Sequence, residues 1–235
     1  MKPRIIQHLA APALIASLFG LAAAPASASS HNAAEVAKWT VAEWHDTMQS
    51  MPEGDAEQGK KLHDQTFCAS CHGDHGESLS GNWPRLAGQR AEYTYKQLID
   101  YADGRRSEDN RSQLMIVVSE DLSEQDMADL AAFYEQQGLP ETAKPAKSHP
   151  AHQLISVGDP ARLITPCSAC HGSNGSGGIN ESSTLRGQPE VYFIRTMKLF
   201  RDGYRDNDVA HGMSQFAKPL TDAEIAALAD YYAAE

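Results

Sequence analysis

Two kinds of pattern are missing from this sequence. Beyond residue 28, no apolar run approaches the roughly 18 to 20 residues that a helix needs to cross a bilayer. No segment alternates apolar and polar residues over any length, as a half-buried strand does. The first absence argues against a membrane-spanning segment in the rest of the chain, and the second argues against a β-sheet. We therefore predict an all-α fold.

Positively charged residues are also scarce. The chain has 20 Lys and Arg against 31 Asp and Glu, a formal net charge of −11. Nucleic acids and anionic membrane surfaces attract basic proteins, so we expect neither as a partner. The acidity favours solubility, binding to basic proteins, or both.

The most apolar segment lies at the start of the chain. Lys2 and Arg4 precede a mostly apolar stretch, residues 5–21, and Ala26-Ser27-Ala28 has the small residues of a cleavage site. We predict a signal peptide over residues 1–28, cleaved after Ala28, and a mature protein outside the cytoplasm. An uncleaved N-terminal anchor of similar length is the alternative.

Cysteine occurs at four positions, and all four belong to one repeated motif. The motif is Cys68-Ala69-Ser70-Cys71-His72, and it returns as Cys167-Ser168-Ala169-Cys170-His171. C-x-x-C-H is the attachment signature of a c-type haem. Each thiol forms a thioether with a haem vinyl group, and the adjacent histidine binds the iron. We predict two covalently bound haem c groups, with His72 and His171 as proximal ligands.

Three other uses of a C-x-x-C pair fit this sequence less well. Half of a zinc site would need further Cys or His pairs at finger-like spacing. A thioredoxin-like redox motif would need a surrounding βαβ pattern. Two structural disulfides would leave the adjacent histidine and its repetition unexplained.

The two motifs belong to a longer internal repeat. Leu86-Ala87-Gly88-Gln89 returns 99 residues later as Leu185-Arg186-Gly187-Gln188, and the helical pattern at 130–134 returns at 228–232. A register that drifts by one residue over most of a domain indicates duplication. Each half is too small for a large apolar core, so the haem must supply part of that core.

Breaks in this pattern give the domain boundaries. We predict an N-terminal extension at 29–52, a first domain at 53–139, a Pro-rich linker at 140–153 and a second domain at 154–235. Within the extension, four apolar residues fall on one face of a predicted amphipathic helix: Ala37, Val41, Trp44 and Met48. Such a helix packs on its own domain or docks a partner, and the sequence favours neither.

Each domain has one methionine at the same position of the repeat. Met115 lies 43 residues after His72, and Met213 lies 42 residues after His171. Because His/Met ligation raises the reduction potential and suits electron transfer, we predict that these are the second axial ligands. His211 is an alternative to Met213. The other methionines after the signal peptide lack a repeat partner or fit core packing: Met48, Met51, Met127 and Met197.

A proximal histidine also needs a hydrogen bond to its other ring nitrogen. Pro84 follows His72 by 12 residues, and Ser183 follows His171 by the same interval. We predict that the two backbone carbonyls accept these hydrogen bonds. The stiffness of proline is present in the first domain alone, so we expect different reduction potentials at the two haems.

With these residues in view, the chain resembles the di-haem cytochrome c4 family of tandem class I cytochrome c domains. The resemblance covers about residues 53–235. It rests on the two C-x-x-C-H motifs and on Met115 and Met213, with the Leu-x-Gly-Gln segments in support. It implies a periplasmic protein with two haem-bearing lobes packed face to face and rapid electron exchange between them. The N-terminal extension departs from the family pattern.

The resemblance implies an electron-transfer protein, not an enzyme. We expect a periplasmic one-electron carrier between redox proteins, for example towards a terminal oxidase, with no small-molecule substrate and membrane contact only through a membrane-bound partner. One alternative is a cytochrome subunit or dedicated electron acceptor of a periplasmic sulfide or thiosulfate dehydrogenase. The other is a di-haem peroxidase, which would need an open axial position.

The predicted partners have a basic docking face. Residues 53–139 carry 8 basic and 17 acidic side chains, a net charge of −9, whereas residues 154–235 carry 7 and 10, a net charge of −3. We therefore expect the first domain to attract a basic partner more strongly.

Overall fold

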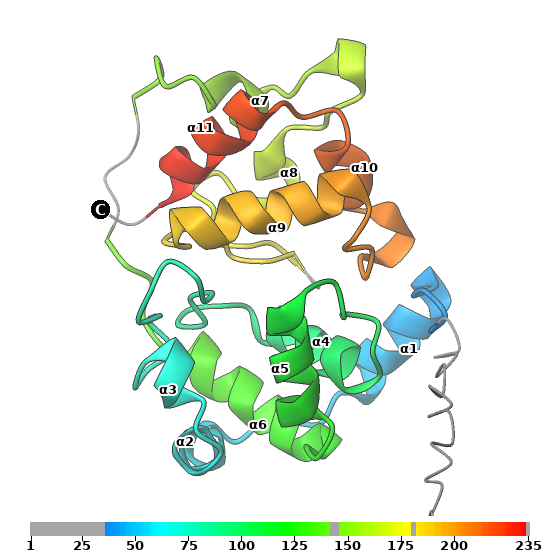
Figure 1. Cartoon of the computed structure of the whole chain (residues 1–235), viewed down its shortest axis with the longest axis vertical. Helices are drawn as coiled ribbons and strands as arrows, with labels where there is room; N and C mark the ends of the chain where they lie inside the picture. Colours follow the sequence, from blue (N-terminus) through cyan, green and yellow to red (C-terminus); the bar gives the residue numbers. More distant parts are fainter. Residues whose placement is uncertain (1–35, 142–145, 180–181, 234–235) are drawn as a thin grey trace, which may run out of the picture. The chain divides into compact units, whose positions relative to one another are not determined.

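The computed structural model describes residues 36–141, 146–179 and 182–233. These residues belong to one compact unit, and the predicted signal peptide lies outside them. In the described ranges the regular structure is helical, apart from one isolated β-bridge between Asp159 and Ile164. The predicted all-α fold is therefore confirmed (Figure 1). None of the described helices is long and apolar enough to cross a membrane.

The first domain is organised around its last helix. Its elements are α2 (Ala56–Gln65), α3 (Ala69–His72), α4 (Ala91–Ala102), α5 (Asn110–Ser119) and α6 (Glu124–Glu135). Helices α2 and α4 both pack against α6 (Figure 1), and Tyr95 and Phe133 lie in the resulting core. Helices α2 and α6 approach closely at Gly59, where an added Cβ would lie 2.0 Å from the carbonyl oxygen of Asp129. No larger residue fits there.

The second domain repeats this plan, with shorter helices before the motif and next to the repeated methionine. It contains α7 (His152–Ser156), η1 (Pro160–Arg162), α8 (Cys167–His171), α9 (Glu190–Asp202), η2 (Val209–His211), α10 (Ser214–Ala217) and α11 (Asp222–Tyr232). Helices α9 and α11 pack against each other (Figure 1), with Phe193, Ile225 and Leu228 in the core. Ala151 and Leu154 lie in the same core, so the packed structure begins within the segment predicted as a linker.

The last helix of each domain starts with the same polar cap. At α6, the side chain of Ser123 accepts from the amide of Asp126, and the Asp126 carboxylate accepts from the amide of Ser123. Thr221 and Glu224 form the same capping box at α11. Such reciprocal bonds satisfy two amides that the start of a helix leaves unpaired. Ser123 and Thr221 therefore mark equivalent helix starts in the two domains.

The N-terminal extension forms one short helix, α1 (Val41–Ser50), capped by Thr40. The predicted apolar face is only partly correct. Trp44 is buried, but Val41 is 63 % exposed, and the second buried aromatic residue is Trp39, which precedes the helix. A residue outside the helix does not follow helical periodicity, so the pattern did not identify it.

The two domains contact each other through equivalent residues of the repeat. The Gln89 side chain exchanges two hydrogen bonds with the backbone of Thr184, at 3.1 and 2.7 Å. Gln188, the counterpart of Gln89, does the same with the backbone of Arg85, the counterpart of Thr184, at 2.8 and 3.1 Å. The contact therefore has local two-fold symmetry, and the glutamine of each Leu-x-Gly-Gln segment belongs to it.

Candidate haem-binding sites

Each C-x-x-C-H motif folds into one short helical turn. Helix α3 ends at His72 and α8 ends at His171, and in both cases the next residue is a glycine with positive φ, Gly73 at 82° and Gly172 at 79°. Glycine adopts this conformation without strain, so the chain turns away directly after the histidine of each motif. The four cysteines are free thiols. The two thiols and the histidine of each motif are therefore available for haem attachment.

Both motif histidines make the hydrogen bond that the sequence predicted. The Nδ1 atom of His72 lies 3.1 Å from the carbonyl oxygen of Pro84, and that of His171 lies 2.8 Å from the carbonyl oxygen of Ser183. A carbonyl accepts, so Nδ1 carries the proton and Nε2 has the lone pair that a metal needs. Burial lowers the pKa of His72 to about 4 and also lowers the pKa of His171, so both rings are neutral at neutral pH.

A tyrosine at the end of each last helix closes the motif loop. An added Cβ at Gly76 would lie 2.8 Å from the Tyr134 ring, and one at Gly175 would lie 2.7 Å from the Tyr232 ring. The carbonyl oxygens of Tyr134 and Tyr232 also accept hydrogen bonds from Gly88 and Gly187. Both tyrosines are part of the sequence repeat, but their contact with the motif loop depends on tertiary structure and was not predicted.

One histidine of the first domain was not anticipated. His63 in α2 is fully buried, and its Nδ1 atom lies 2.8 Å from the hydroxyl of Tyr134. Burial lowers the pKa of His63. Burial also raises the pKa of Tyr134 well above its usual range, and Cys68, which lies close to it, adds to this shift. The pair therefore stays neutral and packs beside the first motif.

The two repeated methionines lie at the edges of their domain cores. Met115 is in α5 and packs half-buried against the first core, and Met213 directly precedes α10 and packs half-buried against the second. The carboxylate of Asp208 accepts from the backbone amides of Met213 and Ser214, at 2.8 and 2.7 Å. This fixes the backbone at Met213.

The other residues considered as axial ligands lie in different environments. Met127 and Met197 are buried within the two cores, at 4 % and 6 % exposure, where they pack as apolar side chains. His211, the alternative to Met213, is exposed and has a φ of 58°.

Between the domains lies a buried group of charged side chains with an incomplete set of partners. Arg106 and Arg205 both donate to the Gln97 side chain, at 2.8 Å. Arg106 also pairs with the carboxylate of Glu108 at 3.0 Å. Within the described part of the chain, the Nη1 atom of Arg205 is buried without a hydrogen-bond partner. Burial would raise the pKa of Tyr192, but the two arginines lower it to about 8. Buried cations with an unused donor suit an anionic ligand group.

The residues present fit haem. Four free thiols match the vinyl groups of two porphyrins, the two Nε2 atoms match two irons, and the unused guanidinium donor suits a propionate. Among the described residues no group of three or more His, Cys, Asp or Glu side chains forms a separate metal site. The fold and the two motifs thus define a c-type cytochrome with two haem c groups.

Comparison with known proteins agrees with this class. The cytochrome c family model matches twice, at residues 56–137 and 161–233. The chain is 36 % identical over 167 residues to cytochrome c4 of Thiocapsa roseopersicina, covering 70 % of this chain and 84 % of the relative. It is 32 % identical over 193 residues to a thiosulfate dehydrogenase electron acceptor of Stutzerimonas stutzeri, covering 77 % and 88 %.

A match to a solved structure also indicates a cytochrome c4. Reduced recombinant cytochrome c4 from Pseudomonas stutzeri matches with a TM-score of 0.68 and 32 % identity, covering 76 % of this chain and 97 % of that one. The chain belongs to the cytochrome c4 family. It is a di-haem electron-transfer protein, and its partners are redox proteins.

Proposed function

We propose that the protein is a periplasmic one-electron carrier between redox proteins, with His72 and Met115 as axial ligands in the first domain and His171 and Met213 in the second. The observation that supports this most directly is the pairing within each domain. Each domain has a neutral histidine whose Nδ1 donates a hydrogen bond to a backbone carbonyl, and a half-buried methionine at the same position of the repeat. The predicted signal at 1–28 supports export to the periplasm, as does the covalent attachment of haem.

The haem at each motif supplies an iron that accepts and releases one electron. The chain's own residues hold and tune this group. The carbonyls of Pro84 and Ser183 keep the two imidazoles in one tautomer and raise their basicity. A thioether at each cysteine prevents loss of the group. With haem bound, Met115 and Met213 would close the two irons to small molecules and so would favour electron transfer over catalysis.

The absorption spectrum of the ferric protein tests the methionine ligands. Sulfur-to-iron ligation gives a weak band at the red end of the visible spectrum, and Met115→Ala and Met213→Ala should each remove about half of it. Met127→Leu is the matched control, because Met127 is buried in a core, and it should leave the band unchanged. If either Ala variant keeps the full band, the iron of that domain has another ligand or an open position.

We further propose that a basic redox partner docks on α5 of the first domain. This helix exposes Leu114 at 58 % and Val117 at 64 %, on the same helix as Met115. The exposed carboxylates of Glu120 and Asp121 follow directly. An apolar centre with an acidic rim complements a basic protein surface, and the charges mainly accelerate encounter.

Stopped-flow electron exchange with a soluble cytochrome that has a basic docking face tests this surface. The double variant Glu120→Gln, Asp121→Asn should slow association at low ionic strength and reduce its salt dependence. Glu190→Gln, an exposed residue in the second domain, is the control and should have a smaller effect. Equal effects per charge removed would mean that overall charge, and not this surface, governs association.

A second candidate role is that of dedicated electron acceptor for a sulfur-compound dehydrogenase. The similarity to a protein named thiosulfate dehydrogenase electron acceptor favours it. Mixing the oxidised protein with a thiosulfate dehydrogenase and thiosulfate distinguishes the two roles. Reduction much faster than that of an unrelated c-type cytochrome under the same conditions supports the dedicated role, and equal rates support a general carrier.

A further inference from the structure

The N-terminal extension precedes the first cytochrome c match, which begins at residue 56, yet it contacts both domains. Its Trp39 indole donates to the Oδ1 atom of Asp100 in α4 at 2.5 Å. Asp100 Oδ2 accepts from Lys96, also in α4, at 2.6 Å, and from the side chain of Asn207 in the second domain at 2.5 Å. Lys96 also donates to the backbone carbonyl of Asn207 at 2.6 Å. We name these four residues the Asp100 cluster.

The Asp100 cluster is buried and joins three parts of the chain. Asp100 is fully buried, Lys96 is 2 % exposed, Asn207 is 3 % and Trp39 is 6 %. A single carboxylate thus receives donors from the extension, the first domain and the second domain. A buried carboxylate that loses a donor pays a large desolvation cost, so each contact depends on the presence of the others.

Further contacts tie the extension to the second domain. Lys38 pairs with Asp206 at 2.5 Å. The Trp39 and Trp44 rings form an apolar cluster with Val209 of η2. The Lys96 ammonium lies 5.4 Å from the centre of the Trp39 ring, within the range of a cation–π interaction.

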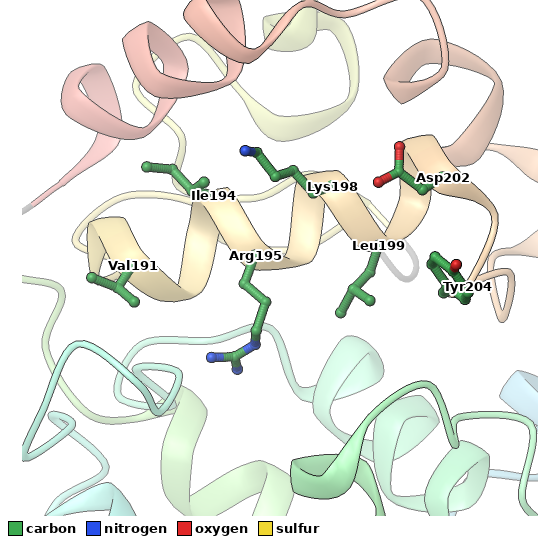
Figure 2. A pocket seen from close by; sticks show the side chains of 7 residues that line it. All are labelled: Val191, Ile194, Arg195, Lys198, Leu199, Asp202 and Tyr204. Carbon is green, nitrogen blue, oxygen red and sulfur yellow. The ribbon is translucent and has the colours of Figure 1, made fainter.

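Among the described residues, the second domain does not repeat this arrangement. The counterpart of Asp100 in α9 is Leu199, whose side chain is apolar and cannot accept hydrogen bonds. Around Leu199 the surface is a shallow groove lined by α9 and the turn after it, including Val191 and Tyr204 (Figure 2). The matching face of α4 is the one that the extension covers.

We infer that the Asp100 cluster is a positioning device: through it the N-terminal extension fixes the first domain against the second and so sets the rate of electron exchange between the two haem groups. Trp39, Lys96, Asp100 and Asn207 are positioning residues. They hold the interface between the domains. The effect on electron exchange rests on the proposed carrier function. The fixing of the first domain against the second can be tested independently.

Hydrogen exchange of the haem-loaded protein tests the structural part. Trp39→Phe keeps an aromatic ring and removes the indole donor, and Asp100→Asn removes the charge. Both should accelerate amide exchange in residues 204–212 of the second domain by about tenfold or more, which corresponds to about 1.4 kcal/mol. Val41→Ala, on the exposed side of the same extension, is the control and should leave exchange there unchanged.

Electron exchange between the haems tests the consequence. One haem is reduced by a short radiolytic pulse, and redistribution of the electron is followed by absorption. We expect slower redistribution in Trp39→Phe and Asp100→Asn than in Val41→Ala, with the spectrum of each haem unchanged. Unchanged spectra keep this test separate from that of the methionine ligands.

Two results would overturn the inference. If exchange accelerates only within residues 36–51 and α4, the extension merely stabilises the first domain. If exchange accelerates in 204–212 but electron redistribution keeps its wild-type rate, the cluster holds the domains without affecting their function. Should Asp100→Asn fail to fold, Asn207→Ala replaces it, because this variant removes the side-chain donor that the second domain offers to Asp100 and keeps the pair of Asp100 with Lys96.

Discussion

Replacing Gln89 with alanine removes one half of the symmetric contact between the domains. The side chain pairs with both backbone groups of Thr184, a residue that is 2 % exposed. Each buried backbone group left without a partner costs about 1–3 kcal/mol. We expect a loss of about 2–4 kcal/mol in the free energy of unfolding, in the lower part of the summed range because water can enter beside the shortened side chain.

Urea denaturation of the haem-loaded protein, followed by far-ultraviolet circular dichroism and by haem absorption, measures this loss. Gln188→Ala should cost less, because its partner Arg85 is half-buried whereas Thr184 is buried. Gln136→Ala is the control: its side chain is exposed after α6, so the change should stay within about 0.5 kcal/mol. Losses within that range for both Gln89→Ala and Gln188→Ala would refute the view that this contact couples the two domains.

Three further changes follow from local geometry. Gly76→Ala combines a φ of +79° with a contact of 2.8 Å to the Tyr134 ring and should cost about 2–5 kcal/mol in urea denaturation. Gly203→Ala has a similar φ, +78°, but open space, and an equal loss there would show that the ring contact is unimportant. Ser123→Ala removes the cap of α6 and should cost about 1 kcal/mol in thermal unfolding, so an unchanged midpoint would contradict the role of the cap. Burial alone would raise the pKa of Glu108, but the charges of Arg106 and Arg205 outweigh this effect and lower the pKa to about 2. Its contribution, about 3 kcal/mol, is therefore present above pH 4.5 and is lost as pH falls towards 2, and Glu108→Gln should flatten that part of the stability curve; an unchanged slope would contradict this.

Several features of the fold and the sites could be predicted because they depend on residues close together in the chain. The C-x-x-C-H spacing places two thiols and an imidazole on one helical turn. Pro84 follows His72 by the same 12 residues that separate Ser183 from His171, and both carbonyls lie beside the imidazoles. The capping box at the start of α6 lies within four consecutive residues, 123–126. Short connections leave few alternative conformations.

Other features were not predictable, because they depend on distant partners. The partner of Gln89 is 95 residues away in the sequence, and the repeat shows that the glutamine recurs but not what it binds. Trp39 lies just outside α1, so helical periodicity placed Val41 on the buried face instead. Asp100 lies on an amphipathic helix among ordinary polar residues, and only tertiary structure reveals that it is fully buried.

The two-fold symmetry of the Gln89 and Gln188 contacts has a consequence for how strong the interface needs to be. Two separate copies of a single domain joined by such a contact would form a symmetric dimer, whose population falls with dilution. In one chain the same contact closes within the molecule, at an effective concentration on the order of millimolar for a short flexible connection. A contact too weak to hold two free domains together at cellular concentrations is then sufficient. Duplication within one chain thus makes the pairing of the two haems independent of how much protein the cell contains.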